Sequence, residues 1–338
     1  MRALAHECGF ELAGVAAAVP LEDAERYRQW VAAGHAGDMR YLTDRRAGVR
    51  ENPRNLLDSA RSIICVGKLY QTPWPHSTRF HDDDRAWISR YAWGDDYHDV
   101  LRAGLERLAA RLQEHAGPFE WKLCVDTAPL LERSYARLAG LGWIGKNTCL
   151  INQQSGSWFF LGELIVSLEI EPDAPPPDRC GTCSRCIDAC PTAAIVPSGE
   201  GYAVDSRLCI SYFTIEQRGS IAEENRAGMG AHVFGCDICQ DVCPWNGRAP
   251  VTADEAFAPR HFAPRLDELA ALSEAEFRSM FRGTPVTRAR YSGFLRNVAI
   301  AMGNQKLPAF RAPLEKMAAS EDAVVAEHAR WALERLPR

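Results

Sequence analysis

The sequence predicts an α+β fold in three parts, and three observations predict it. Apolar residues in the N-terminal half alternate between helical and strand-like spacing. Eight of the twelve cysteines fall between Cys180 and Cys243, and the spacing after Pro250 is helical. We therefore expect an N-terminal α/β domain over residues 1–172, a cysteine-rich domain over 173–250 and a helical domain over 251–338.

The N-terminal elements follow from local spacing. Helical periodicity, with Gly34 as a terminator of the first helix, predicts helices at residues 22–33, 100–115 and 129–138. Short stretches rich in β-branched residues, and one long apolar stretch, predict strands at residues 61–70, 121–125 and 158–170. This alternation is the basis for the mixed N-terminal domain.

The two later parts are separated from the first by composition. Four prolines within residues 171–178 forbid a helix and disfavour a central strand, so this stretch reads as a linker. Near the C-terminus, when residues 297–302 are aligned with residues 328–333, apolar residues coincide at four positions. Two weak copies predict a short HEAT-like helical domain that packs on its neighbours.

The composition is that of a soluble globular chain. Its net charge of −5 over 338 residues excludes a polycation, so any nucleic-acid surface must be a local patch. Glu7 and Glu11 interrupt the N-terminal apolar run, which argues against a signal peptide. Glu163 and Glu169 interrupt the most apolar segment, which is too short to span a membrane. We expect a cytoplasmic monomer that does not bind membranes.

The cysteines are expected to be metal ligands, because the cytoplasm keeps thiols reduced. Cys180-x-x-Cys183-x-x-Cys186-x-x-x-Cys190 followed by proline is the bacterial ferredoxin run, whose fourth cysteine serves a second cluster. The later run from Cys236 is one cysteine short, and Cys209 can supply the missing ligand. We assign one [4Fe–4S] cluster to Cys180, Cys183, Cys186 and Cys243, and the other to Cys190, Cys209, Cys236 and Cys239.

A pair of zinc ribbons is the alternative, since Cys-x-x-Cys pairs also suit tetrahedral zinc. Zinc does not explain the three-residue gaps before the two Cys-Pro pairs at Cys190 and Cys243. Two neighbouring clusters indicate electron transfer, and the residues alone give a two-cluster redox protein with an unknown acceptor.

Two other patterns fail in context. The glycines of residues 140–145 fit G-x-G-x-x-G, but they follow a predicted helix, and Asn147 stands where a phosphate loop needs Ser or Thr. Asp96-Tyr97-His98 is similar to the start of the D-x-H-x-x-G signature of cobalamin carriers with a histidine lower ligand, but Leu101 replaces the glycine.

Several blocks together resemble the epoxyqueuosine reductase family, nearly from end to end and in the same order. They are ISRYAWGDDYH at residues 88–98, VDTAP at 125–129, GLGWIGKNT at 140–148, GSWFFLGE at 156–163 and the two cysteine runs ending in CPWN at 243–246. Cys149 departs locally from the polar residue, often asparagine, expected there.

The resemblance implies a cobalamin-dependent reductase that removes the epoxide oxygen of epoxyqueuosine at the tRNA wobble position to give queuosine. It implies cobalamin without a protein histidine below the cobalt. It also implies an N-terminal cobalamin-binding domain, a ferredoxin-like two-cluster domain and HEAT-like C-terminal helices. The implied partners are tRNA bearing epoxyqueuosine, contacted at its anticodon loop, and an external electron donor such as flavodoxin or ferredoxin.

Asp126 is the candidate proton donor for the opened epoxide, because it follows a predicted strand and belongs to the VDTAP block. Its pKa would have to be raised by burial for it to hold a proton. The alternative is that Asp126 caps the next helix.

The resemblance also yields candidate cobalamin contacts. Ser211 and Tyr212 follow the cluster ligand Cys209, where electrons would enter the corrin. The remaining candidates are Arg50, Trp93, Tyr97, Asp126, Asn152 and Gly162. Trp93 could instead be a core residue, and Arg50 could face nucleic acid or solvent.

Residues 277–314 are basic without a single acidic residue. Such a one-sign stretch is typical of a phosphate-binding face, although it could also be a solvated face. The candidate tRNA contacts are Arg218, Arg282, Arg288, Arg290 and Arg296. Specificity would come from an unstacked anticodon base that enters the active-site cleft.

Two rival functions remain at this point. A reductive dehalogenase also combines two clusters with a corrinoid, and the arginine-rich C-terminal region argues against it. A plain electron carrier would leave the long N-terminal domain without a role.

Overall fold

An antiparallel sheet of four strands forms the centre of the N-terminal part of the chain. The structure, a computed structural model, describes residues 1–337. The strands, in the order β1-β2-β7-β4, are β1 (Leu12–Ala17), β2 (Ser62–Leu69), β7 (Phe159–Val166) and β4 (Trp121–Cys124). The central strand β2 is buried along its whole length, which explains its apolar composition. The three strands expected at 61–70, 121–125 and 158–170 are confirmed.

All pairings in this sheet are antiparallel. The mixed N-terminal domain expected from the sequence is therefore built on an antiparallel sheet, in keeping with the predicted α+β class. Alternating helical and strand-like segments do not require parallel crossovers, because a helix can also connect antiparallel strands across a sheet face.

Two helices cover the two faces of the sheet. Helix α5 (Tyr97–Ala116) packs its leucines, among them Leu101 and Leu105, on one face. Helix α6 (Glu132–Leu138) packs Tyr135 on the other face. The helix expected from residue 129 begins three residues later, because residues 128–130 form a turn first. The other helices of this part are α1 (Arg2–Glu7), α2 (Asp23–Ala32), α3 (Arg40–Thr43) and α4 (Arg46–Val49).

The cysteine-rich part is built from short elements, as expected for a chain that wraps metal clusters. Residues 171–178 are extended without regular structure, and Asp173 accepts a hydrogen bond from the Val15 amide of β1. The helices are α7 (Arg185–Asp188), α8 (Glu223–Arg226) and α9 (Ile238–Asp241). A hairpin of β8 (Ile195–Ser198) and β9 (Gly201–Val204) belongs to this part, and a hairpin of β5 (Trp143–Ile144) and β6 (Leu150–Ile151) precedes it in the chain.

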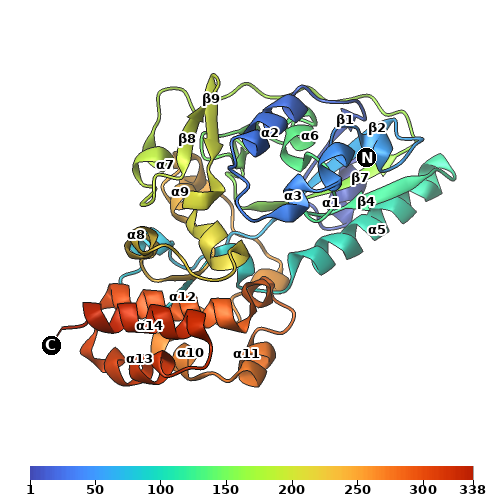
Figure 1. Ribbon diagram of the computed structural model, residues 1–338. Helices are drawn as coiled ribbons and strands as arrows, with labels where there is room; N and C mark the ends of the chain where they lie inside the picture. Colours follow the sequence, from blue (N-terminus) through green and yellow to red (C-terminus); the bar gives the residue numbers. More distant parts are fainter. Residues whose placement is uncertain (338) are drawn as a thin grey trace.

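The C-terminal part is helical, as expected. It contains α10 (Leu266–Ala271), α11 (Glu274–Met280), α12 (Arg290–Gln305), α13 (Arg311–Ala318) and α14 (Ala323–Arg335). Figure 1 shows α12 and α14 lying side by side, and they carry the two matching segments at 297–302 and 328–333. The HEAT-like nature of this part stays a prediction.

One large core joins segments that are far apart in the sequence. Strand β3 (Trp87–Ile88) pairs in parallel with β10 (His232–Phe234), and both pack against α12. The N-terminal residues 86–93 are therefore part of the core under the C-terminal helices, so the three-part division by residue number stays a prediction. Within residues 1–337, the helices are all too short or too polar to cross a membrane.

Candidate functional site

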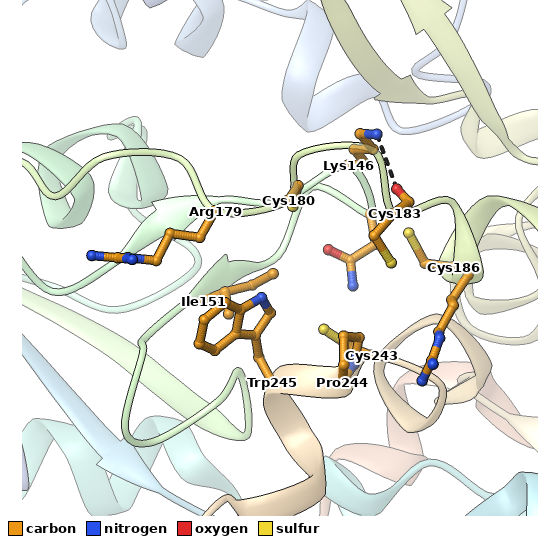
Figure 2. A pocket seen from close by; sticks show the side chains of 11 residues that line it. Lys146, Ile151, Arg179, Cys180, Cys183, Cys186, Cys243, Pro244 and Trp245 are labelled. Carbon is orange, nitrogen blue, oxygen red and sulfur yellow. Dashed lines mark hydrogen bonds between the residues drawn. The ribbon is translucent and has the colours of Figure 1, made fainter.

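The first cysteine set lines a cavity of about 320 Å³. Figure 2 shows Cys180, Cys183, Cys186 and Cys243 around it, the first three from the loop before α7 and at its start, the fourth from the segment after α9. Lys146 secures the loop, since its Nζ donates to the carbonyl oxygens of Gly181 and Cys183. The structure thus brings together the four ligands predicted for one cluster.

The second cysteine set gathers deeper in the molecule. Burial raises the pKa of the Cys236 thiol, and the nearby Cys209 and Cys190 raise it further. The neighbouring Cys149 thiol and burial raise the pKa of the Cys239 thiol, and Cys236 and Cys209 are close enough to raise it further. The four predicted ligands of the second cluster are therefore neighbours, and Cys149 lies against one of them.

Asp126 lies at the tip of a strained loop that follows β4. Its φ of 48° is in the left-handed region, which non-glycine residues rarely adopt and which is common at functional sites. Its Oδ2 lies 3.3 Å from Nε2 of His98 on α5. The other ring nitrogen of His98 lies 2.7 Å from Oδ1 of Asp96, the residue that caps the N-terminus of α5. His98 is thus held between two carboxylates.

This pairing sets the charge on Asp126. The hydrogen bond with Asp126, and then that with Asp96, raises the pKa of His98 to about 9. Desolvation favours the neutral acid of Asp126, but the hydrogen bond and charge of His98 and the charge of Arg288 bring its pKa below its usual value. The pKa is lowered here because a cation lies beside Asp126 and its side chain is 47% exposed, and the rise expected on burial against the cofactor stays a prediction.

Aromatic and charged side chains surround Asp126. The ring of Tyr97 stacks on Phe160 with centroids 4.4 Å apart. Arg288 pairs with Glu216, with Nε 2.7 Å from Oε1, and its guanidinium lies over the ring of Tyr41. Arg288, which the sequence predicts as a tRNA contact, lies close enough to Asp126 for its charge to lower the pKa of that carboxyl group.

A single turn of π-helix, Tyr212–Glu216, connects the second cluster to this neighbourhood. At its start, the backbone of Tyr212 and Ser211 lies beside the Cys209 thiol and lowers its pKa against the effect of burial. At its end lies Glu216, the partner of Arg288. Such π-helical turns are frequent at functional sites. Ser211 and Tyr212, predicted as cobalamin contacts, thus lie beside Cys209, a predicted ligand of the second cluster.

Three of the predicted cobalamin contacts have structural roles here. Trp93 is 3% exposed within the core, and its indole N–H donates to the carbonyl of Ile88. A Cβ on Gly162 would meet Leu105 of α5 at 3.0 Å, so this glycine allows the helix to approach the sheet. The side-chain amide of Asn152 donates to the carbonyl of Leu141, and its oxygen accepts from the backbone amides of Gln154 and Ser155 in the same turn.

Arg50 is 7% exposed rather than solvated. Its guanidinium lies over the ring of Tyr27 and donates to the carbonyl of Tyr41. Arg50 therefore stabilises the segment that contains Tyr41, the residue whose ring lies under Arg288.

Two of the predicted tRNA contacts, the buried Arg296 and the exposed Arg218, donate hydrogen bonds to backbone carbonyls of the protein. Arg296 is 1% exposed, and it donates to the carbonyls of Phe213, Gln217 and Gly219. With its donors used inside the protein, Arg296 is wrong as a tRNA contact. Arg218 likewise donates to backbone carbonyls, those of Ile215, Arg288 and Ala289.

Arg282 and Arg290 are exposed, as a phosphate contact requires. They flank the 3-10 helix Pro285–Ala289, which carries Arg288. Of the five predicted tRNA contacts, Arg296 alone is removed from the exposed basic face by burial.

Sequence reasoning missed His98, Glu216, Glu132 and Glu163 as parts of the site. His98 was noticed only as a failed cobalt ligand, and Glu163 only as an interruption of an apolar segment. The position of Glu163 in the middle of an otherwise apolar strand could have indicated a buried carboxyl group with a functional role.

Two family models match the chain. One, described as epoxyqueuosine reductase QueG, DUF1730, matches residues 50–127. The other, described as a 4Fe-4S double cluster binding domain, matches residues 179–246, which contain both cysteine sets. The second match supports iron–sulfur clusters over zinc ribbons.

Similar proteins cover nearly the whole chain. Epoxyqueuosine reductase of Xanthomonas campestris pv. campestris is 41% identical over 98% of this chain and 94% of the relative. That of Pseudomonas aeruginosa is 41% identical over 97% and 91%, and that of Escherichia coli is 37% identical over 97% and 86%.

Solved structures give the same result. A crystal structure of epoxyqueuosine reductase with an epoxyqueuosine-modified tRNA-Tyr stem loop has a TM-score of 0.89 at 29% identity, covering 99% of this chain and 88% of the other. The enzyme from Streptococcus thermophilus has a TM-score of 0.87 at 30% identity, covering 100% and 90%.

Proposed function

The chain belongs to the epoxyqueuosine reductase family, and from that premise we propose that it reduces epoxyqueuosine in tRNA with two [4Fe–4S] clusters and a bound cobalamin. The reaction is a reduction of a modified tRNA base, so the protein is an oxidoreductase. Family membership also decides against a plain electron carrier and a dehalogenase.

The eight cysteines fit the two clusters. One set surrounds a cavity, and the members of the other are mutual neighbours. The first set lies nearer the surface, since burial raises the pKa of Cys186 only moderately but contributes to a pKa well above the usual range for Cys236 and Cys239 of the second set. Electrons from an external donor would therefore enter at the first cluster and pass to the second.

The residues around Asp126 fit a cobalamin that has no histidine below the cobalt. Both ring nitrogens of His98 are already hydrogen-bonded, to Asp96 and to Asp126, so this histidine is not free to bind a metal. Tyr97 and Tyr41 offer aromatic surface beside the same carboxylate. Bound cobalamin would supply a low-potential cobalt centre that passes electrons from the clusters to the substrate.

Asp126 and His98 handle the proton in this proposal. An epoxide oxygen that is released by reduction needs a proton. At neutral pH the proton of the Asp126–His98 pair resides on the imidazole. When cofactor and tRNA exclude water from the loop, desolvation favours the neutral acid, and the proton can move to Asp126 Oδ2 for delivery.

The observation that carries the proposal is the continuity between the second cluster and Asp126. The π-helical turn begins beside Cys209 and ends at Glu216, which pairs with Arg288 next to Asp126. A redox centre and a proton donor are thus linked by one short stretch of chain.

The test is anaerobic incubation of the iron-loaded protein with cobalamin, a reductant and tRNA bearing the epoxide, followed by nucleoside mass analysis. We expect queuosine from the wild type. Asp126→Asn should lose on the order of 10²- to 10⁴-fold in turnover while it still binds tRNA. Full activity of Asp126→Asn would remove Asp126 as the donor, and no queuosine from the wild type would refute the function.

A further inference from the structure

Two carboxyl groups behind Asp126 have no role in the chemistry described so far. Glu163, in the middle of β7, is 0% exposed, and neither of its carboxyl oxygens has a hydrogen-bond partner. Glu132, the first residue of α6, has its Oε1 buried without a partner. Buried carboxyl groups without partners are costly, and they are concentrated at functional sites.

The fold places these groups next to Asp126. Glu163 lies opposite Cys124, the last residue of β4, so it is beside the strand end from which the Asp126 loop leaves. The backbone and the charge of Asp126 lie close enough to the Glu132 carboxyl group to shift its pKa. Glu132 and Asp126 are in turn the acidic groups close enough to raise the pKa of Glu163. The three carboxyl groups therefore form a series that runs from the exposed loop to the buried strand.

The two inner groups hold protons at neutral pH. Burial, and then the charge of Asp126, raises the pKa of Glu132 to about 8 against the opposing effects of Arg133 and His98. Burial, and then Glu132, raises the pKa of Glu163 well above its usual range.

The remaining groups that face Glu163 are thiols. They are Cys65 of β2 and Cys124 of β4, and burial raises the pKa of both. These thiols are neutral, so no cation from the strands compensates an ionised Glu163. Two protonated acids therefore lie behind one ionised carboxylate.

The reaction needs more protons than Asp126 can hold. Loss of the epoxide oxygen as water breaks both of its C–O bonds and leaves an alkene. Two electrons, supplied through the clusters, and two protons are consumed for each water released. Asp126 carries one proton at a time, so it must be re-protonated within the reaction.

We propose that Glu132 re-protonates Asp126 during turnover and that Glu163 shares its proton with Glu132 from behind. The Glu132 carboxyl proton passes to the Asp126 carboxylate, Glu163 then donates a hydrogen bond to the carboxylate left on Glu132, and solvent restores the proton after product leaves. Glu132 and Glu163 act through Asp126 and are positioning residues. The proposal rests on the proposed function.

The test compares pH profiles of turnover for the wild type, Glu132→Gln and Glu163→Gln. Wild-type kcat should fall as the pH rises through about 8, where Glu132 loses its proton. Glu132→Gln should lower kcat on the order of 10- to 100-fold, with little change in KM, and should remove the fall near pH 8. Glu132→Asp, which keeps a carboxyl group, should retain part of the activity that Glu132→Gln loses and should again show a fall of kcat at alkaline pH.

Glu169→Gln is the matched control, because it makes the same change just beyond β7 on a side chain that is 81% exposed. It should behave as the wild type. A Glu132→Gln variant that folds, turns over within twofold of the wild type and keeps the same alkaline limb would overturn the proposal.

A second readout needs neither cofactor nor turnover, so it separates this inference from the proposed function. The cofactor-free protein at pH 7 should show the infrared carbonyl band of buried protonated carboxylic acids. Glu163→Gln should remove part of that band, and Glu132→Gln should remove a part that titrates near pH 8. A wild-type protein without this band would overturn the proposal even if it makes queuosine.

Discussion

At the scale of single residues, the site depends on where one proton resides. His98 is held between Asp96 and Asp126, and its pKa is raised to about 9. Asp126 is therefore an ion-paired carboxylate before cofactor and substrate arrive. Its activation as an acid depends on the exclusion of water rather than on permanent burial.

The first prediction concerns this pair. In a histidine-resolved NMR titration, the resonance of His98, assigned through its loss in His98→Gln, should report a pKa near 9. Asp126→Asn should lower it toward the ordinary value of 6.5, because the hydrogen bond with the Asp126 carboxylate, the largest cause of the raised pKa, is lost. A wild-type His98 that titrates near 6.5 would contradict the ion pair.

The same pair has a consequence for stability. Because the pKa of His98 is raised by folding, its contribution is complete below pH 6.5 and is lost as the pH rises through about 9. The lowered pKa of Asp126 makes its contribution disappear only in acid. With Asp126 half exposed, the total should be ~1 kcal/mol or less in the free energy of unfolding.

A second prediction separates buried from exposed arginines. Arg296→Met should lower the free energy of unfolding by about 3 kcal/mol, because it leaves the carbonyls of Phe213, Gln217 and Gly219 without donors. Arg290→Glu should leave the free energy of unfolding unchanged and weaken tRNA binding. The slope of the logarithm of the tRNA binding constant against the logarithm of the salt concentration should fall by about one. Denaturant titrations and tRNA affinities at several salt concentrations check both.

The opposite pattern would contradict these assignments. A stable Arg296→Met protein with weakened tRNA binding would return that residue to the interface. Unchanged affinity and salt slope in Arg290→Glu would make the exposed arginines an ordinary solvated face.

At the scale of elements, the main feature is the close approach of α5 to the sheet at Gly162. A Cβ there would lie 3.0 Å from Leu105 Cδ1 and 3.3 Å from Leu101 Cδ2. Gly162→Ala should therefore destabilise the fold by about 1–3 kcal/mol. Its corrinoid affinity, measured on the folded protein, should stay within twofold of the wild type. A large loss of affinity without a loss of stability would instead place Gly162 at the cofactor.

The elements themselves were largely predictable, because each has a local cause. The leucines of α5, the β-branched residues of β2 and the prolines of the linker determine local structure without long-range contacts. The cluster ligands were predictable for the same reason, since thiolate spacing is a property of the motif.

What the sequence could not predict depends on contacts across the fold. The parallel pairing of β3 with β10, the burial of Arg296 and the position of Arg288 beside Asp126 each join residues far apart in the chain. A basic side chain in a one-sign segment looks the same whether it binds phosphate or backbone carbonyls. Only the packing of α12 against the π-helical turn distinguishes the two.

At the scale of the whole molecule, the fold lets distant segments share one site. Strand β3 lies in the core that the C-terminal helices share, and Asp96, a few residues further on, caps α5, which packs on the sheet. Figure 1 shows α5 beside the sheet strands β4 and β7. Cluster ligands, Asp126 and the exposed arginines are thereby brought onto one continuous framework. Removal of any one part should disturb the other two.

The central claim is that the clusters deliver electrons to a corrinoid held beside Asp126. The most direct measurement is an anaerobic titration of the iron-loaded protein, carrying about eight iron atoms per chain, with cob(II)alamin, followed by electron paramagnetic resonance. The account predicts stoichiometric binding with a cobalt signal that shows no splitting from a histidine nitrogen. An iron-loaded protein without affinity for any corrinoid, or a cobalt bound by histidine, would contradict it.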